Sequence, residues 1–437
     1  MSPVQISIKD YKAVKSAEID LNGITVISGI NGSGKSSISR LLYYALKYAN
    51  DYESLVYNSV RPKLSSIDRL INSFTTGLSR NVTTAEIEKY YKLAAESDHL
   101  DEKIDAYCAA LESLKAFAIE HGQTTDQRVK NSLNRLRSII EESAIERENS
   151  KKVLLSENIE EVIRKAKDIK IKANELSKNR DYNLYKRNLI RVLEDDLKNV
   201  RITEYGVPFF GKDVENVTIL NYVQQAVYID TPMVVGMNRF MGYPIMEYRR
   251  DLNTLLEIPD QNSYSHSLNQ NIKDIIHGYS YYDDGYTFYG NMKYKRDDGL
   301  TIDLKDGATG IKSFSLLQLL LRNGVISSNT MLIIDEPESH LHPEWINRFA
   351  EILVLLIKNI NLKVLITTHS PNLMLALNVY AKKAGIEQDS HFYLAEKISD
   401  TSSQIRGIDG SIGEGYSHLS IPLVEMNIQY ESLISEE

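Results

Sequence analysis

The run Gly29-Ile30-Asn31-Gly32-Ser33-Gly34-Lys35-Ser36 fits the phosphate-loop pattern G-x-x-x-x-G-K-[ST] without a mismatch. A short β-branched run at residues 23–28 precedes it and a helical pattern opens at residues 37–42, which is the setting that the motif requires. Glycines let backbone N–H groups turn toward phosphate oxygens, and a helix N-terminus adds partial positive charge. We therefore expect Lys35 to reach the β- and γ-phosphates of ATP and Ser36 to hold Mg²⁺. The phosphate contacts are assigned to Asn31, Gly32, Ser33, Gly34, Lys35, Ser36 and Ser37.

Bulk composition bounds the classes of protein to consider. The chain has 437 residues, 42% of them hydrophobic and 25% charged, which is ordinary for a globular protein of two or three units. It has no apolar run of about 18 residues and no secretory leader, so no membrane partner is expected. Cys108 is the single cysteine, which favours a reducing cytoplasm. DNA binding is possible through a local patch, but the net charge of −8 does not indicate it.

Patterning predicts three segments. Residues 1–84 combine antiparallel β structure over 3–28, the phosphate loop with its helix, and a short helical connection interrupted at Arg61-Pro62. Residues 85–199 have no proline and carry apolar residues at three-four spacing, which predicts an inserted helical subdomain with short coiled-coil seams. The seams are Leu100, Ile104, Tyr107, Leu111 and Leu114; Val129, Leu133, Leu136 and Ile140; and Ile159, Val162, Ala166, Ile169, Ala173 and Leu176.

The third segment, residues 200–437, returns to strands. Runs at 216–220 and 226–230 read as strands, and Asp297-Asp298-Gly299 is typical of a hairpin turn. Apolar strands at 330–336 and 362–369 are separated by a helix that begins at Pro343, an order that predicts a parallel sheet and an α/β fold. A further strand is expected at 392–394. Turns are expected at 283–285 and 410–415, the latter flexible.

Two strand ends carry candidate chemistry. The apolar strand from residue 330 ends in Asp335-Glu336, and the next one ends in His369. Asp335 would bind Mg²⁺ directly or through water, and Glu336 would orient and polarise the attacking water. A neutral His369 imidazole would hydrogen-bond the γ-phosphate.

The order of the phosphate loop, a helical insertion, Gly310, IDEPESHLHP and TTHSPN resembles the ABC-type ATPase heads of the SMC, RecF and OLD families. This resemblance implies a P-loop NTPase of ABC-ATPase type with an N-terminal antiparallel β lobe. It also implies a homodimer or higher homo-oligomer in which Thr309 and Gly310 of one copy face the ATP held by the other. The counterpart of the D-loop would be residues 339–342.

The sequence departs from that group at two places. Ala308-Thr309-Gly310 stands where the signature loop usually has serine, although Thr309 keeps a hydroxyl. The glutamine that senses Mg²⁺ is not clear, and Gln224, Gln225 and Asp230 are candidates by position.

Several functions fit this pattern. The first is an ATP hydrolase that switches a partner; the alternatives are a nucleotide sensor that scarcely hydrolyses and a small-molecule kinase. Stand-alone chains of this build resemble the ATPase subunits of bacterial anti-phage systems such as PARIS and Septu, which implies a separate nuclease as effector. DNA repair of the RecF type is the other role that the resemblance allows.

Overall fold

The computed structural model describes residues 2–76, 84–143, 154–236, 246–259, 266–283, 291–339 and 341–435. The chain forms two compact units: a head, made of Met1–Asn50 and Lys186–Glu437, and a helical unit, Asp51–Tyr185. The helical unit thus begins and ends earlier than the insertion predicted at 85–199. The reason is that the helix after residue 51 packs against other helices of this unit rather than serving as a connection.

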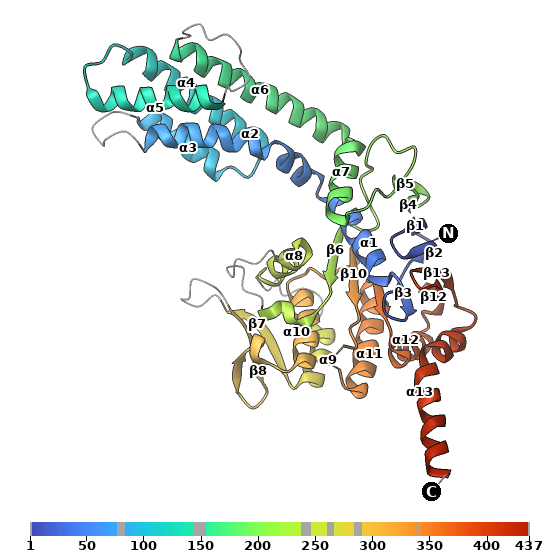
Figure 1. Cartoon of the computed structure of the whole chain (residues 1–437). Helices are drawn as coiled ribbons and strands as arrows, with labels where there is room; N and C mark the ends of the chain where they lie inside the picture. The colour runs from blue at the N-terminus through green and yellow to red at the C-terminus, as the bar shows by residue number, and fades with distance from the viewer. Residues whose placement is uncertain are drawn as a thin grey trace. The chain divides into compact units, whose positions relative to one another are not determined.

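A large sheet, ten-stranded among the described residues, forms the centre of the head (Figure 1), in the order β5-β4-β1-β2-β13-β12-β3-β11-β10-β6. Strands β12, β3, β11, β10 and β6 run parallel, and β1 pairs antiparallel with both β2 and β4. This arrangement confirms the predicted α/β fold with an antiparallel lobe. The strands are β1 (Val4–Tyr11), β2 (Val14–Leu21), β3 (Ile24–Gly29), β4 (Val200–Glu204), β5 (Val207–Phe210), β6 (Gln225–Ile229), β10 (Thr330–Asp335), β11 (Lys363–Thr368), β12 (Ser390–Ser399) and β13 (Ser402–Gly407).

Three of the parallel strands are buried along their whole length and carry mostly apolar side chains. Every residue of β3, β10 and β11 is buried. Alternate residues of these strands join one hydrophobic cluster with α10 (Thr309–Arg322), α11 (Pro343–Ile360) and α12 (Pro371–Ala384). Helix α1 (Lys35–Asn50) contacts β6, β10 and β11. Burial on this scale fixes the strand order and therefore the place of each strand end.

The part of the head between β5 and α10 differs from its prediction in two ways. Residues 216–220 form no strand, and α8 (Glu247–Leu256) lies in a region predicted as strands. Helix α9 (His266–Ile276) and the sheet β7 (Gly278–Asp283), β8 (Asn291–Arg296) and β9 (Thr301–Asp303) follow. The hairpin at 297–299 is confirmed by the β8–β9 pairing. Most of the predicted 283–285 turn lies outside the described residues. Short 3-10 turns are η1 (Pro232–Gly236), η2 (Leu304–Asp306) and η3 (Glu387–Asp389).

The helical unit is built on the predicted three-four seams. Its helices are α2 (Tyr52–Thr75), α3 (Ala85–Glu96), α4 (Leu100–Glu120), α5 (Gln127–Ser143) and α6 (Leu155–Asn179), with α7 (Tyr182–Leu193) spanning the boundary to the head. The seam of α4 is buried from Ile104 to Leu114, and on α6 Ile163 is buried where Val162 was predicted. The expected break at Pro62 is wrong, because α2 continues through this exposed proline.

The end of the chain also departs from its prediction. The strand expected at 392–394 is the middle of β12, but residues 410–415 are not simply a turn, since α13 (Ile412–Ser435) begins among them. Among the helices that the structure describes, none is long and apolar enough to cross a bilayer.

Candidate phosphate site at the sheet edge

Three strand ends meet at one edge of the head sheet. Strand β11 lies between β3 and β10, and all three run parallel. In register, Thr368 pairs with Ser28 and Asp335 pairs with Thr367. The phosphate loop, His369 and Glu336 each follow directly from one of these strand ends. Segments about 300 residues apart in the sequence are thus neighbours, as the carboxyl ends of parallel strands must be.

A cavity of about 340 Å³ lies at this edge. It is lined by Lys12, Ala13, Asn31, Gly32, Ser33, Gly34, Lys35, Ser36, Ser37 and Glu336. All seven predicted phosphate-loop residues and the predicted water-orienting carboxylate therefore face one space. Lys12, in the turn between β1 and β2, brings a second cation to the cavity. Sequence reasoning missed it, because the residues of a tight turn do not indicate which part of the folded protein the turn will contact.

The contact between the phosphate loop and the start of β2 explains why residue 34 is a glycine. Gly34 has a φ of +88°, and a Cβ atom there would lie 2.6 Å from Cγ2 of Val14. Any side chain would therefore be strained and would clash with the first residue of β2. The loop conformation depends on a contact that only the folded lobe supplies.

Lys35 lies folded over the phosphate loop. Its Nζ donates hydrogen bonds to the carbonyl oxygens of Gly29 and Ile30, at 2.8 and 3.0 Å. Burial lowers the pKa of this ammonium, whereas the charges of Glu336, Glu338 and Asp335 oppose the lowering of its pKa. A buried ammonium whose described partners are neutral carbonyl oxygens would gain charge compensation by exchanging them for phosphate oxygens.

Asp335 is held in place by two neutral donors. Tyr228 donates its hydroxyl to Oδ2 at 2.5 Å and Thr367 donates to Oδ1 at 2.7 Å. Burial and the Asp335 charge raise the pKa of Tyr228, so its hydroxyl remains a donor. Each oxygen keeps a second acceptor site, so Asp335 could bind Mg²⁺ directly or through water. Among the described residues no cluster of three or more metal-ligating side chains exists, so an ion here would also need phosphate oxygens.

Glu336 has a strained backbone. Its φ is +46°, which is uncommon for a residue with a side chain, and its N–H donates to the Thr367 carbonyl at 2.9 Å. That hydrogen bond holds the residue at the end of β10, with its side chain one-third exposed and in the cavity. Strain at a residue that faces the phosphate loop is typical of a functional position.

Glu338 is a second carboxylate that sequence reasoning missed. Its Oε1 accepts hydrogen bonds from the Thr368 hydroxyl at 2.6 Å and from the His369 N–H at 2.9 Å. Its Oε2 is buried and has no hydrogen-bond partner in the described part of the chain. The His369 Nδ1 lies 3.4 Å from Glu338 Oε1 and 3.5 Å from Glu336 Oε1. Two carboxylates therefore flank the imidazole, and only the tertiary fold brings Glu338 to it.

Thr309 and Gly310 open helix α10 and do not line this cavity. A Cβ atom on Gly310 would lie 2.5 Å from the ring of Trp345, so the glycine is also required for packing against α11. Of the predicted D-loop counterpart, His340 lies outside the described residues. The His342 Nδ1 accepts from the Glu344 N–H at 3.3 Å and caps α11.

The structure excludes two of the three candidates for the glutamine that senses Mg²⁺. Gln225 begins β6 and pairs with Thr330, the first residue of β10, while Asp335 ends that strand. Gln224 and Gln225 therefore lie at the opposite edge of the sheet, about 16 Å away at 3.3 Å per residue. Asp230 does follow the correct end of β6, but its carboxylate pairs with Arg249 and accepts from the Tyr248 hydroxyl.

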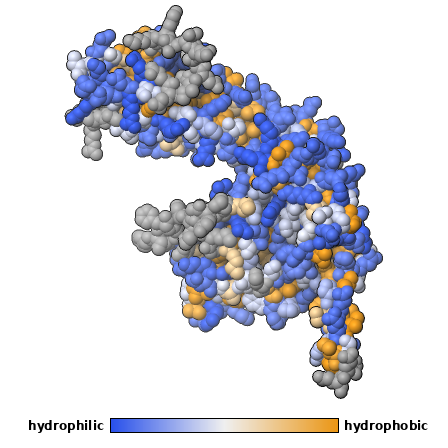
Figure 2. All heavy atoms as spheres, in the orientation of Figure 1, coloured by the Kyte–Doolittle hydropathy of each residue, from blue (hydrophilic) through white to orange (hydrophobic). Residues whose placement is uncertain are grey.

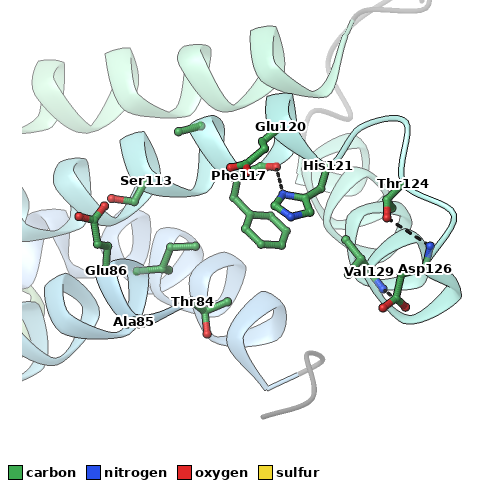
Figure 3. A pocket seen from close by; sticks show the side chains of 12 residues that line it. Thr84, Ala85, Glu86, Ser113, Phe117, Glu120, His121, Thr124, Asp126 and Val129 are labelled. Atoms are coloured by element: carbon green, nitrogen blue, oxygen red, sulfur yellow. Dashed lines mark hydrogen bonds between the residues drawn. The ribbon is translucent and has the colours of Figure 1, made fainter. Parts of the chain in front are cut away.

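A larger cavity, of about 540 Å³, lies within the helical unit (Figure 3). The ring of His121 stacks on Phe117 with centroids 4.2 Å apart, and Glu86, Glu120 and Asp126 also line the space. No lysine or arginine is among its described lining residues. It is therefore unsuited to a triphosphate, and the phosphate loop remains the candidate nucleotide site.

Comparison with known proteins gives matches over most of the chain. A family model described as an AAA ATPase domain matches residues 1–374. An uncharacterized protein of Methanocaldococcus jannaschii, MJECL11, is 37% identical over 78 residues, which are 18% of this chain and 66% of that protein. This chain thus spans just under two thirds of that relative's length.

Solved structures with similarity include Smc head domains. One from Pyrococcus furiosus, with an extended coiled coil and bound to the C-terminal domain of ScpA, is 13% identical, with 97% of this chain and 98% of that chain covered and a TM-score of 0.35. An SmcHead bound to the C-winged helix domain of ScpA is 12% identical, with coverage of 94% and 98% and a TM-score of 0.38.

Proposed function

Because this chain belongs to the AAA ATPase domain family, we propose that it binds ATP with Mg²⁺ at the phosphate loop and hydrolyses the γ-phosphate bond. The observation that carries the proposal is the single cavity shared by the phosphate loop and Glu336. A phosphate-binding loop alone supports binding, but hydrolysis also needs a side chain placed to orient the attacking water, and a carboxylate can do this. Here that carboxylate comes from the neighbouring strand end.

Each residue has a distinct part in this mechanism. Lys35 neutralises charge on the β- and γ-phosphates, and the loop N–H groups of residues 31–37 bind their oxygens. Ser36 and Asp335 would hold Mg²⁺, which supplies charge neutralisation between the phosphates when bound. Glu336 accepts hydrogen bonds from the attacking water and orients it. His369, whose N–H donates to Glu338, is not among the residues that line the cavity and would reach the γ-phosphate from the end of β11.

The proposal extends to a head-to-tail dimer. Thr309 and Gly310 begin a helix away from the cavity of their own chain, so a second copy would supply them to it. A helix N-terminus offers free N–H donors to a γ-phosphate. ATP would then join two copies and hydrolysis would release them. Through this cycle the chain would switch a partner, for which the resemblance to anti-phage ATPase subunits favours a separate nuclease.

Two substitutions test the hydrolase. Lys35→Ala should abolish ATP binding, because the removed ammonium faces the phosphates. Glu336→Gln should keep ATP affinity and reduce the hydrolysis rate by about 100-fold or more, since the amide cannot accept a proton from water. Glu351→Gln, on the outer side of α11 beside Arg348, is the matched control and should behave as the parent. Parental hydrolysis by Glu336→Gln would refute the assigned role.

The competing function is a nucleotide sensor that scarcely hydrolyses. The departure at Ala308-Thr309-Gly310 and the absence of a glutamine among the described residues lining the cavity favour it. The sensor would be supported if the parent protein bound ATP tightly but hydrolysed it no faster than the Glu336→Gln variant does. Trp345 is the only tryptophan and packs on Gly310, so its fluorescence reports whether ATP changes this helix start.

A further inference from the structure

Helix α13 has two halves with different surroundings. Its first half belongs to the head: Leu419 and Ser420 are buried, and a Cβ on Gly415 would lie 2.7 Å from Ile408. Arg406 also donates to Glu414 at 2.9 Å. From Ile421 to residue 434 every residue is exposed, and this half extends away from the other elements of the head (Figure 1).

The exposed half is apolar. Figure 2 shows hydrophobic residues gathered along α13, at the lower right of the molecule. Eight large side chains are exposed there: Ile421, Leu423, Val424, Met426, Ile428, Tyr430, Leu433 and Ile434. Glu425 and Glu431 are the only charged residues of this half. Soluble proteins rarely leave a contiguous apolar surface of this kind uncovered.

The apolar residues follow a heptad pattern. Tyr416, Leu419, Leu423, Met426, Tyr430 and Leu433 recur at alternating spacings of three and four, the a and d positions of a coiled coil. Leu423, Met426, Tyr430 and Leu433 are 62–65% exposed. A second row, Ile421, Val424 and Ile428, has the same spacing on another side of the helix. Both glutamates fall outside the a, d, e and g positions of the first row.

The backbone of the exposed half of α13 is weakened close to its start. Pro422 lies inside the helix and cannot donate the hydrogen bond to the His418 carbonyl. Through residue 434 the described residues that follow it are exposed, and a helical segment without packed neighbours gains little stability in water. Packing of its apolar rows would therefore have to stabilise it.

We propose that α13 is a self-association helix, which packs along the exposed part of this row, from Leu423 to Leu433, against α13 of further copies of this chain. The two rows together present on the order of 800 Å² of apolar surface, about what each partner contributes to a stable interface. Pairing of two copies along the first row brings no like charges together, because Glu425 and Glu431 lie outside its contact positions. The absence of lysine and arginine between residues 421 and 434 disfavours an anionic membrane surface, which amphipathic helices bind through such residues. The second row allows more than two helices to meet.

The test is the mass of the full chain in solution without nucleotide, in a Lys35→Ala background so that ATP-linked association is absent. We expect a dimer or larger species at micromolar concentration. Leu423→Glu with Leu433→Glu should reduce the mass at least twofold, because both charges would enter the seam. Ser432→Glu, a charge placed off the seam on the same helix, is the matched control and should leave the mass unchanged.

A second measurement does not depend on the charged variants. Met426→Cys, in a chain with the buried Cys108 replaced by serine, should form an intermolecular disulfide under oxidation, because d positions face each other in a parallel pair. A monomeric parent, or an unchanged mass in the double variant, would overturn the proposal. The proposal would also be overturned if the double variant lost binding to neutral lipid vesicles or to another protein while its mass in solution stayed equal to that of the parent.

Discussion

Glu336 and Glu338 are two residues apart, yet the fold gives them different surroundings. Glu336 is one-third exposed and faces the phosphate-loop cavity, whereas Glu338 is buried with one oxygen unpartnered. Burial of a carboxylate is costly, and here two hydrogen bonds to Oε1 and the nearby Lys35 ammonium offset only part of that cost, since Oε2 has no partner among the described residues. Its contacts to Thr368 and to the His369 N–H make it a positioning residue for the end of β11.

Glu338→Gln should therefore separate activity from stability. We expect kcat for ATP hydrolysis to fall by about 10- to 100-fold, as is typical when a residue supporting a reactive group is altered. The melting temperature should be unchanged or higher, because the buried charge is removed. Steady-state kinetics and thermal unfolding measure both quantities, with Glu387→Gln, on the surface near Lys382, as the control. A large loss of stability would instead make Glu338 a structural residue.

At the scale of single elements, α2 shows that helix packing can outweigh a local breaker. Pro62 is exposed within this helix, which buries Leu55, Val60, Leu64 and Ile67 on one side. The proline removes one backbone hydrogen bond without disturbing that face. Residues that flank it thus remain helical because their apolar side chains are covered by α4, α5 and α6.

Pro62→Ala should stabilise α2 by about 1–3 kcal/mol, because alanine restores the N–H donor and relieves the clash with the preceding turn. Hydrogen exchange of α2 peptides in the full chain should slow accordingly. Ser66→Ala, one turn later on the exposed side, is the control for a surface change in the same helix. Faster exchange after Pro62→Ala would show that the proline conformation is required.

The start of β12 carries a pH-dependent contact. His391 Nδ1 lies 3.1 Å from Asp409 Oδ2, and this hydrogen bond and charge raise the pKa of His391. A raised folded-state pKa stabilises the fold fully below the unfolded value, about 6.5, and the gain is lost as pH rises through the folded pKa. Asp409→Asn should therefore lower stability at pH 6 by no more than about 1 kcal/mol, since the carboxylate is half exposed. In urea unfolding the difference from the parent should shrink by pH 8.5, and a difference that grows with pH would contradict the assignment.

On the scale of the whole molecule, every described residue lining the phosphate-loop cavity comes from the head. The helical unit has its own buried core and its own contacts, such as the Tyr107 hydroxyl to Asp68 at 3.0 Å. Compact units with separate cores fold around their own contacts. We therefore expect the proposed nucleotide binding not to require the helical unit.

Replacing residues 52–179 by a flexible Gly/Ser linker should leave a head that binds ATP with a Kd within about threefold of the parent, a change below about 1 kcal/mol. Calorimetric titration of the shortened chain measures this, and Lys35→Ala in the same shortened chain is the negative control. If the shortened chain folds by circular dichroism but no longer binds ATP, the helical unit contributes to the site.

Local sequence was sufficient for the phosphate loop, the strand ending in Asp335 and Glu336, and the helical seams, because motif spacing and apolar periodicity are encoded by neighbouring residues. It was insufficient for the long course of α2 and for the course of the chain beyond residue 410. Local sequence did not identify Lys12 or Glu338 as residues of the site. It also could not reject Gln224 and Gln225 as candidates for the glutamine that senses Mg²⁺. Those depend on strand order and register, which come from burying apolar faces between segments hundreds of residues apart. Strand β11 pairs in parallel with β3 on one side and β10 on the other, and that placement makes one site of three distant segments.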